Sequence, residues 1–217
     1  AYMGEFRGGP LEHRGRARGL PGHDAYRRGL EDGSFAANPV LNGLLETVKK
    51  SGGRLHLAGL LSDGGVHSHI RHLEAICDMA ARAGVPVRVH CIMDGRDTDP
   101  KSGVGFARAL EEHLKDQPLA RDLPVWWGVS TPWTATSAGT GSRRLDLLVH
   151  GQSAEGRVAP DAVKALEVSY AEGITDEFVK PVRCASGPLP DGPRSPWAWP
   201  TGTRSFSSIS GPTACGS

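Results

Sequence analysis

The sequence predicts an α/β fold with a mainly parallel sheet. Residues 55–114 contain two short apolar runs joined by an amphipathic segment, and each run ends in a polar turn that contains glycine. When one helix connects two buried strands, the strands are parallel and the crossover is right-handed. We therefore interpret this stretch as a βαβ unit, and the other elements are placed around it.

The two strands of this unit are short and apolar. The first covers residues 56–61 and ends at the letters SDGG, where two glycines permit a sharp turn. The second covers residues 85–93 and is rich in valine and isoleucine. Between them, residues 68–83 carry apolar side chains at helical spacing, at Ile70, Leu73, Cys77 and Ala80. Gly84 then stands where a helix C-cap is expected.

Three further segments predict helices that accompany the sheet. One begins at Asn38 and Pro39, a cap residue followed by a proline at the first helical position. Another repeats apolar residues every four positions, at Phe106, Leu110 and Leu114. The third covers residues 159–172 and is closed by Gly173. Residues 176–181 are then expected to form an extended segment.

Polar side chains follow both strands of the βαβ unit. In open α/β sheets, ligands bind outside the carboxyl ends of the strands. Arg96 offers a planar fork of donors suited to a phosphate or a carboxylate, His67 can donate a hydrogen bond or carry a proton, and Asp97 can accept one. We therefore expect an anionic small molecule as the ligand.

The same residues have plainer interpretations. An Asp-Gly turn followed by Arg-Asp is often only a solvated loop with a local ion pair. His67 and His69 are compatible with part of a metal site, but two histidines at this spacing without a third ligand are weak evidence. No metal-binding residue is predicted.

Composition limits the class of protein. The chain has 25 basic and 24 acidic residues, which predicts no general attraction to nucleic acid or to an acidic membrane. Its four cysteines show neither metal-site spacing nor a disulfide framework, and no signal peptide or membrane-spanning run is visible. We expect a cytoplasmic protein. A nucleic-acid-binding protein that uses the Gly- and Arg-rich residues 1–28 is an alternative, although the neutral remainder adds no basic patch.

Four motifs carry a resemblance to a known family. They read SDGGVHSH, HCIMDGRDTDPKSG, LLVHGQ and EGITDEFVKP, in this order. From about residue 29 to residue 181 the chain resembles the cofactor-independent (2,3-bisphosphoglycerate-independent) phosphoglycerate mutases. The resemblance implies a two-domain enzyme of the alkaline phosphatase superfamily, of which this chain resembles the inserted phosphotransferase domain, a three-layer α/β/α domain with a mainly parallel sheet.

The resemblance also implies an activity and a site. Such enzymes are isomerases of glycolysis that interconvert 3-phosphoglycerate and 2-phosphoglycerate through a phosphoserine intermediate. Two Mn²⁺ ions lie in the phosphatase-like domain, and we expect their ligands to be missing from this chain. Matched residue by residue, the resemblance implies that His67, Arg96 and Asp97 contact the substrate, and that Asp97 is a candidate for proton transfer with its hydroxyl. The expected partners are these two phosphoglycerates, with no nucleic acid and no membrane, and a monomer is expected.

Three segments depart from the family pattern, and each fits it in a shifted reading frame. Regrouping the bases of permitted codons for residues 5–25 recovers the segment that bears the phosphorylated serine. With the opposite shift, residues 129–142 and 200–216 recover two arginine-bearing motifs. We therefore expect a frame-disrupted and disordered segment at 1–28, a glycerate-binding phosphotransferase domain at 29–183 with a frame-disrupted loop at 128–142, and a frame-disrupted segment at 184–217.

These departures bear on activity. The mutase reaction needs the phosphorylated serine and both arginine motifs, so we expect the chain as written to be inactive. A pseudoenzyme, or a non-catalytic fragment that binds phosphoglycerate, is the alternative function.

Overall fold

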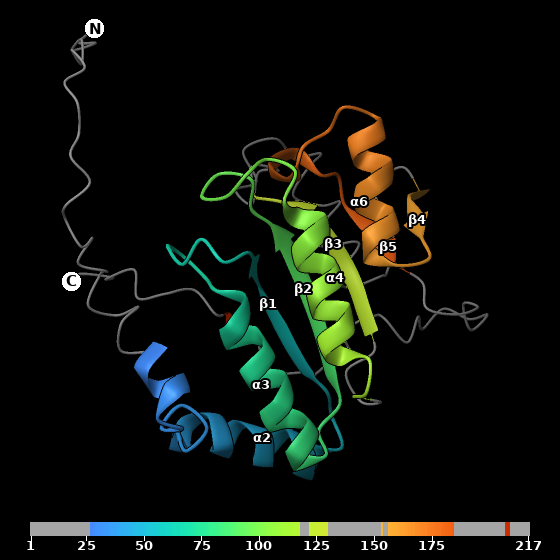
Figure 1. The fold of residues 1–217 in the computed structure, drawn as a ribbon. Helices are drawn as coiled ribbons and strands as arrows, with labels where there is room; N and C mark the ends of the chain where they lie inside the picture. Colours follow the sequence, from blue (N-terminus) through green and yellow to red (C-terminus); the bar gives the residue numbers. More distant parts are fainter. Residues whose placement is uncertain (1–26, 118–121, 130–152, 154–155, 185–206, 209–217) are drawn as a thin grey trace, which may run out of the picture.

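The computed structural model describes residues 27–117, 122–129, 153, 156–184 and 207–208. These residues form a six-stranded sheet with the order β4-β5-β3-β2-β1-β6 (Figure 1). The strands are β1 (Leu55–Leu61), β2 (Val87–Met93), β3 (Asp122–Gly128), β4 (Val158–Ala159), β5 (Val182–Cys184) and β6 (Ser207–Ser208). Neighbouring strands are parallel except β3 and β5, which are antiparallel. The predicted α/β class with a mainly parallel sheet is confirmed.

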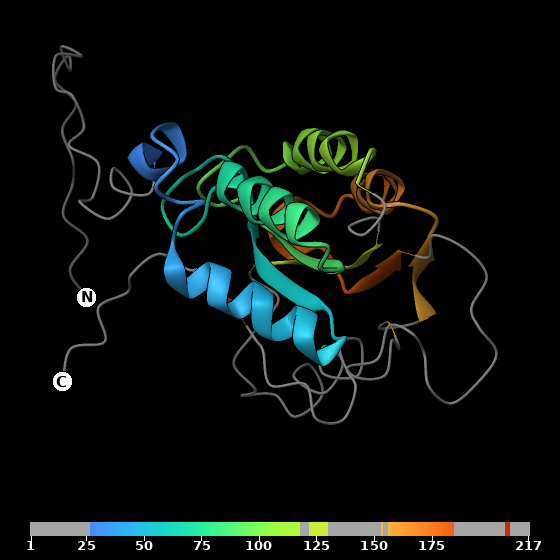
Figure 2. The same cartoon turned by 90° about the horizontal axis from the view of Figure 1, so that it is seen from below.

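The helices follow the predicted pattern. The helices that correspond to predicted ones are α2 (Pro39–Ser51), α3 (Ile70–Ala83), α4 (Gly103–Leu114) and α6 (Ala162–Ala171). A short helix at residues 27–31 precedes them. Figure 2 shows α3, α4 and α6 side by side along one face of the sheet, while α2 lies along β1. None of the helices in the described part is long and apolar enough to cross a membrane.

The predicted helix ends are also observed. The side chain of Asn38 accepts hydrogen bonds from the N–H groups of Val40 and Leu41, so it caps α2. Gly84 follows α3 with φ of 71°, a left-handed conformation that glycine adopts without strain. One prediction is wrong: residues 176–178 are not extended but form a 3₁₀ turn, η3 (Asp176–Phe178).

The core lies between the sheet and the helices α3, α4 and α6, and Leu45 and Val48 of α2 also belong to it. Side chains alternate between the two faces of a strand. On β1 and β2, the apolar side chains that point to one face are buried. They are Leu55, Leu57, Leu61, Val87, Val89, Cys91 and Met93. They form one cluster with apolar residues of the helices.

The intervening residues of β1 and β2 include a buried polar group. His56, Arg88 and His90 are each less than 5% exposed. Nδ1 of His56 and Nε2 of His90 are hydrogen-bonded at 2.9 Å, and the rings stack with centroids 5.2 Å apart. Burial, with the positive charge of Arg88 nearby, lowers the pKa of His56 to about 4 and that of His90 to about 3. Both rings are therefore neutral near pH 7.

The predicted domain limits are not tested by this fold. The segments 1–28, 128–142 and 184–217 lie almost wholly outside the described residues. The LLVHGQ motif lies outside them too, whereas the other three motifs of the resemblance lie within them.

Candidate functional site

The candidate site lies where β1 and β2 end, and Asp94 joins the two strand ends. Ser62 Oγ, directly after β1, donates a hydrogen bond of 2.6 Å to Asp94 Oδ2, directly after β2. Asp94 Oδ1 accepts hydrogen bonds of 3.1 Å from the backbone N–H groups of Arg96 and Asp97. Asp94 is only 3% exposed. This buried carboxylate therefore sets the shape of the Asp-Gly-Arg-Asp turn.

The glycine-rich loop after β1 packs against this turn. A Cβ atom on Gly64 would lie 3.0 Å from Asp97 Cβ, so the two loops approach each other closely here, and a larger residue would push them apart by a few tenths of an ångström. His67 lies in the same loop, three positions further along the chain, and the loop leads into α3 through a hydrogen bond from Ile70 N to Ser62 O. His67, Arg96 and Asp97 are all exposed. The structure therefore brings together the two loops that carry the predicted residues.

Arg96 is held by a residue that the sequence analysis did not select. Its Nε donates a hydrogen bond of 2.6 Å to Glu177 Oε1, 81 positions away in the chain. The Arg96 side chain is 60% exposed and that of Glu177 22% exposed. The plainer interpretation of this turn is a solvated loop with a local ion pair. It does not describe this contact, because the two partners lie 81 positions apart in the chain.

Glu177 lies on η3, which a buried carboxylate anchors. Asp176 Oδ2 accepts a hydrogen bond of 2.8 Å from Gly103 N, at the start of α4, and Asp176 Oδ1 accepts one from Tyr170 Oη on α6. Burial raises the pKa of Asp176, which is 1% exposed. These contacts hold Asp176, and with it the η3 turn, against α4 and α6.

Glycines allow η3 to approach the strand ends. A Cβ atom on Gly103 would lie 2.5 Å from Asp176 Oδ1, and one on Gly95 would lie 2.7 Å from Glu177 N. On Gly128 it would overlap the Glu177 carbonyl group. The sequence contains both the Asp-Glu-Phe motif of η3 and these glycines. No local pattern, however, indicates that η3 packs against the glycines.

The alternative metal site at His67 and His69 is not supported. His69 Nδ1 accepts a hydrogen bond from Arg71 N, so His69 acts as the N-cap of α3. Within the described ranges, no group of three or more His, Cys, Asp or Glu residues could hold a metal ion.

The cysteines of the described part do not offer reactive thiolates. Cys77, Cys91 and Cys184 are buried and free of disulfides. Burial raises the pKa of the Cys77 thiol to about 12 and raises the pKa of the other two thiols as well. These thiols therefore stay protonated at neutral pH.

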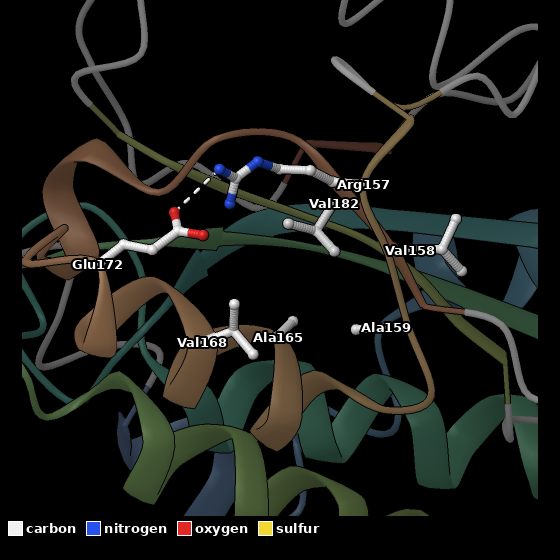
Figure 3. Close-up of a pocket in the computed structure, with 7 residues that line it drawn as sticks. All are labelled: Arg157, Val158, Ala159, Ala165, Val168, Glu172 and Val182. Atoms are coloured by element: carbon white, nitrogen blue, oxygen red, sulfur yellow. Dashed lines mark ion pairs between the residues drawn. The ribbon is translucent and has the colours of Figure 1, made fainter.

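A hollow of about 330 Å³ lies elsewhere, between α6 and the strands β4 and β5 (Figure 3). It is lined by Arg157, Val158, Ala159, Ala165, Val168, Glu172 and Val182. Arg157 Nη2 and Glu172 Oε2 form an ion pair of 2.9 Å at its rim. None of the predicted site residues lines this hollow, so we do not assign it the ligand.

Comparison with known proteins points to one family. Residues 27–129 match the family model described as the BPG-independent PGAM N-terminus. The chain is 45% identical over 163 residues to the 2,3-bisphosphoglycerate-independent phosphoglycerate mutase of Nitratidesulfovibrio vulgaris, and 44% identical over 167 residues to that of a Cyanothece strain. Each alignment covers 75% of this chain, and the chain spans about 30% of the length of these relatives.

A solved structure has the same fold. A phosphoglycerate mutase of Leishmania mexicana, crystallised at low cobalt concentration, superposes with a TM-score of 0.67 at 24% sequence identity. The superposition covers 82% of this chain and 33% of that one. The described α/β arrangement is therefore that of one part of a larger protein.

Proposed function

Since residues 27–129 belong to the family of BPG-independent phosphoglycerate mutases, we propose that this chain supplies the glycerate-binding part of such an enzyme. The activity would be the interconversion of 3-phosphoglycerate and 2-phosphoglycerate in glycolysis, through a phosphoserine intermediate. One observation carries the proposal. The Asp94-shaped turn that bears Arg96 and Asp97 packs against the loop that bears His67, at the carboxyl ends of two parallel strands.

Each predicted residue has a role that follows from its chemistry. The Arg96 guanidinium binds the carboxylate or phosphate of the ligand through paired N–H donors. His67 donates a hydrogen bond to the same anion. Asp97 accepts the proton of the glycerate hydroxyl that attacks the phosphoryl group, and it donates that proton to the glycerate oxygen from which the phosphoryl group leaves.

The proposal routes no step through a metal. The family resemblance implies two Mn²⁺ ions, which would activate the serine nucleophile. The described residues hold no cluster that fits such an ion, and His69 is engaged as a helix cap. We propose that the manganese ligands belong to the part of the family's enzymes that this chain does not match. The near balance of 25 basic and 24 acidic residues supports the proposal that the protein has no general attraction to nucleic acid or to an acidic membrane. We also propose that it is a cytoplasmic monomer.

A second candidate function is binding without catalysis. We propose that residues 5–25, 129–142 and 200–216 are read in shifted frames, so that the phosphorylated serine and two arginine motifs are lost. The limits of the family match support this, because it begins at residue 27 and ends at residue 129, next to two of these segments. On this proposal the 217-residue chain holds phosphoglycerate but does not transfer its phosphoryl group.

Calorimetric titration with 3-phosphoglycerate tests the binding site. Wild-type chain is expected to bind, and Arg96→Ala to bind at least about tenfold more weakly, because it loses a charge-assisted pair of hydrogen bonds. Arg82→Ala is the matched control, since Arg82 is an exposed arginine in the last turn of α3, away from the strand ends. Absence of binding by the wild-type chain, or equal affinities of the Arg96 and Arg82 variants, would refute the proposed site.

A further inference from the structure

Ser62 holds the loop that carries His67 near both of its ends. Its backbone carbonyl accepts a hydrogen bond of 2.8 Å from the N–H group of Ile70, the first residue of α3. Its Oγ accepts a longer hydrogen bond, of 3.4 Å, from the N–H group of Gly64. His67 lies in the loop between these two contacts. Ser62 is therefore the point at which the loop is closed onto the end of β1.

The same serine connects this loop to the turn after β2. The paired residues of β1 and β2 end at Leu61 and Met93. One position further along each strand, Ser62 Oγ donates a hydrogen bond of 2.6 Å to Asp94 Oδ2, and the other oxygen of Asp94 accepts from two backbone N–H groups of the turn. The hydroxyl of Ser62 thus links the two loops at the point where the pairing of the two strands stops.

We propose that Ser62 is a positioning residue, which sets the place of His67 relative to Arg96 and Asp97 so that these three side chains meet one anionic ligand together. The inference rests on the proposed function and adds to it a residue that the ligand does not touch. Ser62 is 1% exposed, so it acts through the two loops and not on the reacting atoms.

A purely structural role is the alternative, and it makes a different prediction. Loss of a buried hydroxyl that donates to a buried carboxylate lowers the stability of the fold, whatever the loops bind. That effect does not depend on His67. A positioning role predicts instead that the effect of Ser62 on ligand binding becomes small once His67 is truncated, because the alignment of its side chain then no longer matters.

The first test is calorimetric titration of the full chain with 3-phosphoglycerate. Ser62→Ala removes the hydroxyl, and Ser62→Cys keeps a side chain of similar size that is only a weak donor. Ser169→Ala is the matched control, because Ser169 is also 1% exposed and donates one hydrogen bond, of 3.0 Å, to Ala165 O within α6. We expect Ser62→Ala to bind about tenfold more weakly than wild type, Ser62→Cys to lie between the two, and Ser169→Ala to bind like wild type.

A double-mutant cycle with His67→Ala separates the two roles. His67 is exposed, so its truncation is expected to leave the fold intact. We expect Ser62→Ala to weaken binding by less than about twofold in the His67→Ala background, against about tenfold in the wild-type background. Equal fold-changes in the two backgrounds, or equal affinities of Ser62→Ala and Ser169→Ala, would overturn the positioning role.

A further readout needs no ligand. The N–H groups of Arg96 and Asp97 donate to Asp94, which loses a partner in Ser62→Ala. Their hydrogen–deuterium exchange is expected to be at least about tenfold faster in Ser62→Ala than in wild type, and unchanged in Ser169→Ala. Unchanged exchange in Ser62→Ala would overturn the inference. Failure of the wild-type chain to bind 3-phosphoglycerate would instead refute the proposed function, and the exchange rates would still show whether Ser62 orders the turn.

Discussion

At the scale of single residues, Asp94 controls the geometry of the candidate site. It connects the hydroxyl of Ser62 after β1 with the N–H groups of Arg96 and Asp97 after β2. Because Asp94 is buried, its removal would leave three polar groups without their acceptor in a place that water reaches poorly.

We therefore predict that Asp94→Ala lowers the free energy of unfolding by about 2–4 kcal/mol. Urea denaturation followed by circular dichroism measures this change. Asp63→Ala is the control, since Asp63 is an exposed aspartate of the neighbouring loop. Equal stabilities of the two variants would show that Asp94 does not carry this role.

The buried His56–His90 pair makes stability depend on pH. The folded-state pKa values, about 4 and about 3, lie below the ordinary value of 6.5. Between these values the unfolded chain binds protons that the folded chain does not bind, so stability rises with pH across this window and is lost as the pH falls.

We predict that the free energy of unfolding falls as the pH is lowered from 6.5 towards 4, by up to about 1.4 kcal/mol per pH unit for each buried histidine. His90→Gln should flatten this dependence, because it removes one of the two buried histidines. Urea denaturation at a series of pH values measures the slope, and parallel curves for wild type and His90→Gln would contradict the assignment.

At the scale of elements, glycines decide how closely segments pack. Gly84 ends α3 in a left-handed conformation with open space around it: the nearest atom to an added Cβ would be Lys49 Nζ at 4.0 Å. Gly128 ends β3 directly against the Glu177 carbonyl group. The first glycine serves a local turn, and the second serves the docking of η3.

Alanine substitutions should separate these two uses. Gly84→Ala is expected to cost about 1 kcal/mol, because only the backbone conformation becomes unfavourable. Gly128→Ala is expected to cost about 2–3 kcal/mol and to release the Arg96–Glu177 contact, because η3 must move away. Urea denaturation gives the two energies, and equal losses would contradict the proposed docking.

The elements also show where sequence reasoning works. The caps at Asn38 and Gly84 and the periodicity of α3 are local patterns, and the structure confirms them. The segment 176–178 was predicted to be extended because no local pattern marks η3. Its conformation is set by the contacts of Asp176 with Gly103 and Tyr170, which no local pattern reveals.

At the scale of the whole molecule, the chain matches one part of a larger enzyme. It spans about 30% of the length of its relatives. We predict that the purified 217-residue chain shows no phosphoglycerate mutase turnover with Mn²⁺ above a metal-free blank. A coupled assay for 2-phosphoglycerate formation measures this, and turnover above the blank would refute the proposed loss of the serine and arginine motifs.

The origin of the altered segments can be examined directly. Resequencing the genomic DNA across the codons for residues 3–29, 119–143 and 182–217 tests the proposed frame shifts. Restored frames would return the serine and arginine motifs to an intact coding sequence. Confirmed shifts would mean that the gene itself carries the breaks.

Periodicity and residues close together in the chain are enough to predict the βαβ unit, its parallel strands, the helix ends and the loops that carry His67, Arg96 and Asp97. By contrast, the contact of Glu177 with Arg96 and that of His56 with His90, across 81 and 34 positions, arise only when the chain folds. Such contacts depend on how strands and helices pack, and packing brings together residues that no local pattern relates.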